Sequence, residues 1–155
     1  MLSAGVAQTL DKLSTGGHIN TKVIKADVKL LLQQNLVDDS VDEAYVLFPD
    51  PWPNAARDAE KRVIRQEILA LLERKIRQGG VLRVATDVEE MAVWTEHVMA
   101  TRPNGLWALK SKHIGSPGNG PPYRAVTKYE LRAAELKHNV YDLEYTLLAR
   151  NNNSM

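Results

Sequence analysis

The chain has 155 residues, of which 44% are hydrophobic and 25% charged, a composition that excludes a disordered or fibrous protein and indicates one domain-sized core. Twenty Lys and Arg against nineteen Asp and Glu give no overall attraction to nucleic acid, so such binding would need local patches. The absence of Cys excludes disulfides and Cys-ligated zinc, and four scattered histidines favour no metal site. These histidines are His18, His97, His113 and His138.

Targeting signals are not apparent in the sequence. The N-terminus lacks the basic start and apolar run of a signal peptide, and no apolar stretch approaches the length that spans a membrane. We therefore expect a cytoplasmic protein without membrane contact. Residues 1–150 are expected to form one domain, partial for its fold class, and residues 151–155 a polar tail.

The N-terminal part alternates between helix and strand signals. Leu2, Val6, Leu10 and Leu13 recur at helical spacing, and a Gly pair at 16–17 ends the pattern. Residues 21–25, TKVIK, are interpreted as a short strand. Asp27 ends this strand and can cap a helix that carries Leu30, Leu31 and Leu32.

The middle of the chain predicts two buried strands. Residues 42–48 form an apolar strand that stops where three prolines interrupt it. Residues 60–77 show one helical apolar face, and Gly79–Gly80 is expected to end that helix. The strand VLRVAT at 81–86 follows, closed by Asp87, and a helix is expected over 89–100.

The C-terminal part predicts two more strands around a helix. A strand is expected over 106–110, a loop over 116–125, a helix from Thr127 and a last strand over 141–149. Thr127 and Glu130 have the spacing of a capping box. The alternation predicts a mainly parallel α/β sheet whose final two strands form an antiparallel hairpin at its edge.

Three aspartates each follow a strand that is predicted to be parallel. They are Asp27, Asp50 and Asp87, and ligands in open α/β sheets collect at the carboxyl ends of the strands. Their carboxylates would then lie along one rim of the sheet. The alternative is that such residues simply cap the next helix, and for Asp27 the two interpretations carry equal weight.

The FPDPW motif, residues 48–52, is the most distinctive segment. Prolines on both sides of Asp50 fix backbone angles and bias the preceding residues toward extended geometry, so a stiff loop would aim the carboxylate. Trp52 offers an aromatic face for stacking. A plain structural turn is the alternative, which the adjacent Trp makes less favoured.

FPDPW, together with GGVLRVATD at 79–87, TKYE at 127–130 and YDLEY at 141–145, resembles the bacterial tRNA guanine-N(7)-methyltransferases in sequence, order and spacing. The resemblance runs from about Asn20 to Tyr145. It implies a Rossmann-like, S-adenosylmethionine-dependent enzyme that methylates a guanosine in the tRNA variable loop.

The resemblance also implies roles for particular residues. Asp27 matches the acid that contacts the cofactor near its adenine, and Asp50 matches the acid assigned to catalysis and to cofactor contact. Asn54 stands where the family has a substrate-binding lysine. The other positions that match the family's substrate side are Asp87, Thr127, Lys128, Tyr129 and Glu130.

The chemistry of guanine agrees with these roles. The N7 atom carries a free lone pair and no proton, so methylation needs alignment and charge stabilisation rather than a general base. Asp50 could accept hydrogen bonds from the Watson–Crick edge of guanine and stabilise the cationic product. Trp52 could support the base by stacking, which makes it a candidate substrate-binding residue.

The sequence departs from the family after FPDPW, where a basic run usually follows. Asp58 and Glu60 interrupt this run. Its remaining basic residues are Arg57, Lys61, Arg62 and Arg65. Fewer phosphate contacts predict weaker tRNA binding, and a plain solvated face is the alternative.

A larger departure is the absence of the family's glycine-rich first strand-turn and of the acid after its second strand, which would precede Leu2. GNG at 118–120 cannot replace the turn, because two prolines follow where a helix should open. Losing these two strands would detach strand 21–25 from strand 42–48 and leave a gap in the sheet. We therefore expect rearrangement, instability or a second chain that completes the sheet.

Two other functions remain open. One is a catalytically inactive tRNA-binding or scaffold fragment of the same family, favoured by the missing cofactor turn. The other is a Rossmann methyltransferase acting on a different nitrogen, which TKYE makes less favoured. Titration with S-adenosylmethionine discriminates the enzyme from the inactive fragment.

Overall fold

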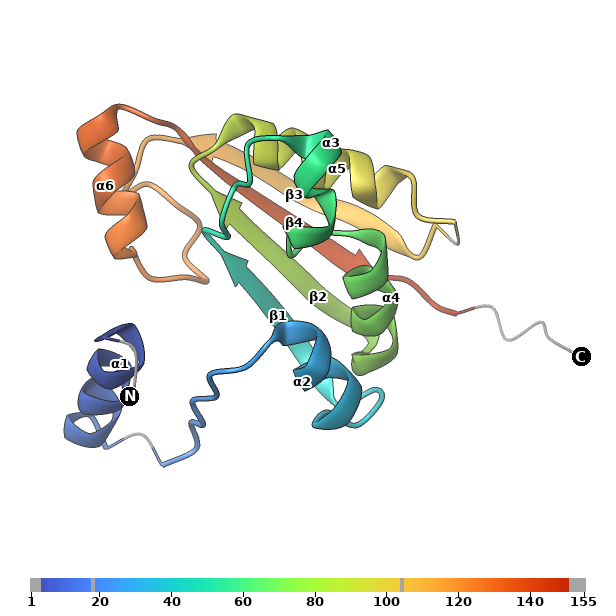
Figure 1. Ribbon diagram of the computed structural model, residues 1–155, viewed down its shortest axis with the longest axis horizontal. Helices are drawn as coiled ribbons and strands as arrows, with labels where there is room; N and C mark the ends of the chain where they lie inside the picture. The colour runs from blue at the N-terminus through green and yellow to red at the C-terminus, as the bar shows by residue number, and fades with distance from the viewer. Residues whose placement is uncertain (1–3, 18, 104, 151–155) are drawn as a thin grey trace, which may run out of the picture.

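A computed structural model describes residues 4–17, 19–103 and 105–150. Four strands form one sheet in the order β1-β2-β4-β3, and helices connect these strands along the chain (Figure 1). The helical elements are α1 (Ala4–Thr15), α2 (Val28–Gln34), α3 (Ala55–Asp58), the 3-10 helix η1 (Ala59–Lys61), α4 (Gln66–Lys75), α5 (Glu89–Ala100) and α6 (Lys128–Leu136). The strands are β1 (Val41–Leu47), β2 (Ile76–Thr86), β3 (Trp107–Gly115) and β4 (Val140–Leu147).

The sheet combines parallel and antiparallel pairs. β1 runs parallel to β2, whereas β4 runs antiparallel to both β2 and β3. β1, β2 and β3 therefore point the same way, and the predicted antiparallel pairing of the last two strands is confirmed. β4 nevertheless lies inside the sheet, where it pairs with β2 on one side and with β3 on the other. The segment that contains α6 connects β3 to β4 and makes this position possible.

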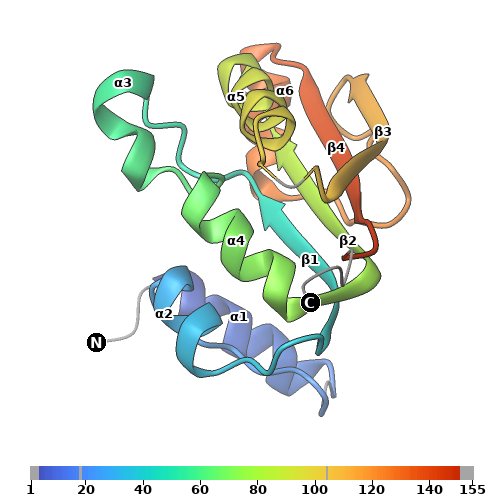
Figure 2. The ribbon, with the colours of Figure 1, turned by 90° about the vertical axis from the view of Figure 1, so that its right-hand side faces the viewer.

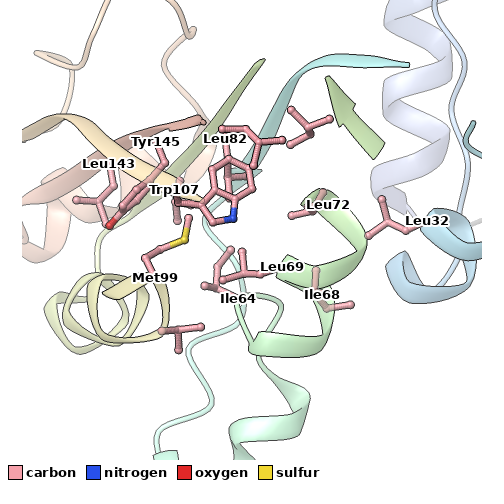
Figure 3. Packing of buried hydrophobic residues seen from close by; sticks show 14 of the residues in the cluster. Leu32, Ile64, Ile68, Leu69, Leu72, Leu82, Met99, Trp107, Leu143 and Tyr145 are labelled. Carbon is pink, nitrogen blue, oxygen red and sulfur yellow. The ribbon is translucent and has the colours of Figure 1, made fainter. Parts of the chain in front are cut away.

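The core lies between the sheet and the helices α4 and α5, with α2 beside α4 (Figures 1 and 2). Apolar side chains of β2 and β4 meet those of α4 and α5, and Leu32 of α2 joins at the border (Figure 3). Fully buried members include Ile68, Leu69, Leu82 and Leu143. Burial at about 1.5–3 kcal/mol for each such side chain holds these layers together. α6 lies beyond the carboxyl ends of β1 and β2 (Figure 1).

The N-terminal segment differs from the prediction. The helix expected from Val6, Leu10 and Leu13 is present as α1, while Leu2 lies outside the described residues. Residues 21–25 form no strand and are largely exposed. A strand needs a partner for its backbone groups, and in the described part of the chain β1 pairs on one side only, with β2. The expected gap next to β1 therefore leaves this segment irregular.

The helix predicted over 60–77 is shorter than expected. α4 begins at Gln66, and Ile76 already belongs to β2. Gly79 and Gly80 lie within β2, so the prediction that they end the helix is wrong. Gly79 has a φ of +78°, and a Cβ at Gly80 would come within 2.6 Å of the Ile76 side chain. The pairing register between β1 and β2 shifts after Val41 of β1. These glycines allow β2 to adopt the irregular backbone that this shift requires.

Candidate functional site

The carboxyl ends of β1 and β2 form one rim of the sheet. Leu47 is in register with Ala85, and the amide of Phe48 donates to the Ala85 carbonyl at 2.7 Å. Asp50 and Asp87 follow these two strands, so both leave the sheet at the same edge. The prediction that the two strands are parallel neighbours is confirmed.

The loop after β1, residues 48–53, has unusual backbone geometry. Phe48 and Trp52 adopt left-handed φ values of 49° and 42°, so the expectation of extended geometry before the prolines that flank Asp50 is wrong at Phe48. Left-handed backbone is rare for bulky residues and carries strain that surrounding contacts must hold. Asp50, between them, is exposed. Strain of this kind is common at ligand sites.

The TKYE segment, residues 127–130, contacts the 48–53 loop through aromatic stacking. The rings of Phe48 and Tyr129 are 5.9 Å apart between centroids and inclined by 17°. Tyr129 remains 47% exposed, and the Lys128 ammonium lies 5.1 Å from the centroid of its ring. Two motifs that are about eighty residues apart in sequence are thus in direct contact, at the loop that carries Asp50.

Glu130 is fully buried, unlike its neighbours in TKYE. Its carboxylate accepts hydrogen bonds from the Arg124 guanidinium and from the Gly118 amide. Burial alone would raise the pKa of Glu130, but hydrogen bonds from Arg124 and the Gly118 amide outweigh it and lower the pKa. Contact between this carboxylate and a substrate would require these bonds to open, and the substrate-binding role from the resemblance stays a prediction.

Arg124 connects α6, β4 and the 48–53 loop. Its Nε and Nη2 donate to Asp142 of β4 at 2.6 and 2.8 Å, and its guanidinium carbon lies 5.9 Å from the centroid of the Phe48 ring. The sequence does not predict this role, because Arg124 lies in the segment PPYRA, whose composition predicts only a loop. A lone Arg in a loop carries no local signal of burial.

Thr127 acts as the predicted N-cap of α6. Its hydroxyl oxygen accepts from the Glu130 amide at 3.2 Å. The reciprocal half of the capping box is replaced, since the Glu130 carboxylate binds Arg124 and Gly118 instead. Thr127 therefore has a structural role, and its expected substrate contact stays a prediction.

Asp27 and Asn54 both serve as helix caps. Asp27 Oδ1 accepts from the amides of Lys29 and Leu30 at the start of α2, and Asn54 Oδ1 accepts from the Arg57 amide at the start of α3. Because no strand precedes Asp27, the structure does not place it on the rim with Asp50 and Asp87. The cofactor role of Asp27 and the substrate role of Asn54 remain predictions.

Asp87 lies in a small hollow between β2, α5 and β4. Its Oδ2 is 3.7 Å from Nδ1 of His138. The hollow has a volume of about 290 Å³. It is lined by Asp87, Val88, Glu89, His138, Asn139 and Tyr141. A carboxylate in an open hollow at the rim is accessible to a polar ligand.

The basic run after the loop is largely neutralised. Arg57 and Lys61 both pair with Asp58, at 2.9 and 2.8 Å, although the Lys61 ammonium also lies 4.7 Å from the centroid of the Trp52 ring. Arg62 is fully buried, so counting it among surface residues available for phosphate was wrong. This segment offers fewer free cations than its composition suggests.

A cavity with a volume of about 610 Å³ lies near Arg65, Trp94 and His97, with neither Asp27 nor Asp50 in its lining. Among described residues, no group of three or more His, Cys, Asp or Glu side chains could hold a metal ion. Within the same ranges, no helix has the length and apolarity needed to cross a bilayer.

Comparison with known proteins identifies relatives along nearly the whole chain. Residues 1–143 match the family described as "Putative methyltransferase". The chain is 34% identical over 145 residues to the tRNA (guanine-N(7)-)-methyltransferase of Nitrosomonas eutropha, covering 94% of this chain and 62% of that protein. It is 35% identical over 142 residues to the enzyme of the same name from Leifsonia xyli, covering 92% and 61%. The chain thus spans about three-fifths of the length of these relatives.

Solved structures show the same fold at low identity. An rRNA methylase from Streptococcus thermophilus matches with a TM-score of 0.56 and 14% identity, over 96% of this chain and 70% of that one. A SAM-dependent O-methyltransferase from Thermotoga maritima matches with a TM-score of 0.53 and 15% identity, over 96% and 48%. The fold is therefore Rossmann-like, as predicted, and this chain covers only part of each of these structures.

Proposed function

Because the chain belongs to this methyltransferase family, we propose that it forms the substrate side of an S-adenosylmethionine-dependent tRNA guanine-N(7)-methyltransferase. The names of its relatives support this proposal. The observation that carries it is the stack between Phe48 and Tyr129. This contact joins the two motif segments that the resemblance assigns to catalysis and to substrate binding.

The residues at the rim suit recognition of guanine. Asp50 is exposed beside the stacked pair and can accept hydrogen bonds from the Watson–Crick edge of the base. The same carboxylate would stabilise the positive charge that develops on the purine as N7 becomes methylated. Trp52 in the loop and Tyr129, which stacks on Phe48, offer aromatic faces for the base. No proton has to be removed, so orientation and electrostatics suffice.

The cofactor would supply the methyl group, and this chain would hold only part of it. Asp50 is exposed and is the residue that the resemblance assigns to cofactor contact, whereas one oxygen of Asp27 is already engaged at the cap of α2. The free side of β1 is where further strands of such a sheet would pair. We propose that a second chain completes the sheet there, and that the activity on tRNA takes place in the cytoplasm.

Methylation of matched tRNA transcripts tests this function. One transcript carries guanosine at the target position of the variable loop, and the other carries 7-deazaguanosine there. With millimolar S-adenosylmethionine, the chain should transfer label to the first and not to the second, because the second has a carbon at position seven. Equal labelling of both would point to a methyltransferase that acts on another atom. Binding of both without labelling would favour the inactive tRNA-binding fragment.

A further inference from the structure

Arg62 is a fully buried cation close to the candidate site. Its Nη2 donates to the carbonyl oxygen of Trp52 at 2.8 Å, and its Nε donates to the same oxygen at 3.3 Å. Nη2 also pairs with Glu90 of α5 at 2.6 Å. One guanidinium thus connects the loop after β1 with the helix after β2, the two elements that follow the rim strands.

The backbone at Trp52 explains why this contact matters. A residue before proline is biased toward extended geometry, yet Trp52 has a φ of 42°. Its carbonyl is held by two N–H groups of a charged donor, and charge-assisted hydrogen bonds of this kind are stronger than neutral ones. The Arg62 guanidinium therefore offsets strain that would otherwise return the 48–53 loop to an extended path.

A purely structural role does not explain why position 62 carries an arginine. The guanidinium carbon lies 4.7 Å from the centroid of the Trp94 ring, and Nη1 is buried with no hydrogen-bond partner among the described residues. Glu90, its pairing carboxylate, is 54% exposed. A buried cation that is only partly satisfied is costly, and an apolar side chain often fills such a space more stably.

We infer that Arg62 is a positioning residue that holds the 48–53 loop, and with it Asp50, in the orientation needed at the rim. The inference extends the proposed methyl transfer, and its kinetic readout rests on that function. The ammonium group of Lys61, the residue before Arg62, lies over the ring of the same Trp52. Lys61 and Arg62 thus hold the side chain and the backbone of Trp52, which limits the movement of the loop.

The loop can be observed directly with 5-fluorotryptophan and ¹⁹F NMR, because the chain has three Trp residues. Single Trp→Phe variants assign the resonances of Trp52, Trp94 and Trp107. In Arg62→Gln, the resonance of Trp52 should shift and broaden, because its backbone is no longer held. The resonance of Trp107 in the core should stay unchanged. Arg74→Gln, which removes an exposed arginine of α4, is the matched control and should leave all three resonances in place.

Glu90→Gln provides a second variant if Arg62→Gln does not fold. Since Glu90 is half-exposed, its loss should be tolerated, and the resonance of Trp52 should shift in the same direction by less. A Trp52 resonance that matches the wild type in every folded variant overturns the inference. This outcome does not depend on methylation, so it is distinct from a failure of the proposed function.

Kinetics separate positioning from general stability. In Arg62→Lys, kcat for methylation should fall on the order of tenfold to a hundredfold while KM for tRNA stays within about twofold, because misplacement of a reacting group mainly affects the chemical step. A rise in KM with unchanged kcat would contradict positioning and assign Arg62 to tRNA binding. An inactive wild-type chain would instead count against the proposed function, and the fluorine spectra would still decide the role of Arg62.

Discussion

The ring of Phe48 stacks on the ring of Tyr129, with centroids 5.9 Å apart and planes inclined by 17°. Phe48 follows β1, and Tyr129 lies in the first turn of α6, so this contact connects the end of the edge strand β1 with a helix beyond the sheet. Arg124 lies near the same Phe48 ring. Loop, helix and buried arginine therefore act as one unit.

Tyr129→Ala should weaken both this unit and the site. Tyr129 is partly exposed, so the fold should persist with a loss of about 0.5–1.5 kcal/mol in unfolding free energy from the aromatic pair. The single-turnover rate of methylation should fall further than this loss of stability accounts for, because Tyr129 stacks on Phe48, two residues before Asp50. Urea unfolding and single-turnover methylation measure the two effects. Leu131→Ala, an exposed change on the same helix, is the control, and equal kinetic effects of the two changes would rule out a role for the stack.

Glu130→Gln should be strongly destabilising. Breaking a buried ion pair by removing one partner costs about 3–5 kcal/mol, and this carboxylate bonds both Arg124 and the Gly118 amide. Thermal and urea unfolding measure the loss. Glu135→Gln, at an exposed position of the same helix, should change stability little. A cost for Glu130→Gln as small as that of the control would mean that the buried network adds nothing to stability.

The same pair predicts a pH dependence. The pKa of Glu130 is lowered from 4.5 in the folded protein, so its ionised form stabilises the fold above that value. The stabilisation is lost as the pH falls through the folded pKa, because both states then carry the protonated carboxyl. The difference in unfolding free energy between wild type and Glu130→Gln should thus be constant near neutral pH and shrink below about 4.5. A difference that stays constant throughout acid unfolding would contradict this assignment.

In an intact version of the protein, Asp50→Ala should remove methylation and leave tRNA binding largely in place. Losing one electrostatic group that stabilises a transition state costs on the order of a hundredfold to a thousandfold in rate, whereas tRNA affinity depends mainly on phosphate contacts elsewhere. Single-turnover rates and filter binding measure the two separately. Asp39→Ala, at an exposed turn before β1, serves as a control. A near-normal rate for Asp50→Ala would show that Asp50 is only a turn residue.

This chain alone should bind S-adenosylmethionine very weakly. If roughly three hydrogen bonds of about 1–1.5 kcal/mol each are missing with the glycine turn and the ribose-binding acid, affinity falls by on the order of a hundredfold to a thousandfold. Isothermal titration at millimolar cofactor measures this affinity. Micromolar binding by this chain alone would mean that a second copy of the chain or a rearranged loop rebuilds the cofactor site, and the account of the missing strands would then be wrong.

Local patterns in the sequence determined much of the framework. The three prolines after residue 47 ended β1, and Asp27 and Thr127 capped α2 and α6, because a cap or a strand end depends on residues a few positions away. The parallel pair β1 and β2 followed from the helix between them. These features were sufficient to place Asp50 and Asp87 at the same edge of the sheet.

Tertiary structure decided which polar residues are free to act. Arg62 is bonded to Glu90, 28 residues away, and Arg124 to Asp142, 18 residues away, so no local window could show that both arginines are buried. The strand expected at 21–25 failed for the same reason, since a strand depends on a partner that its own residues do not specify. Contacts between distant segments, and not residue type, therefore decided which arginines are buried at this site and which charges remain on the surface.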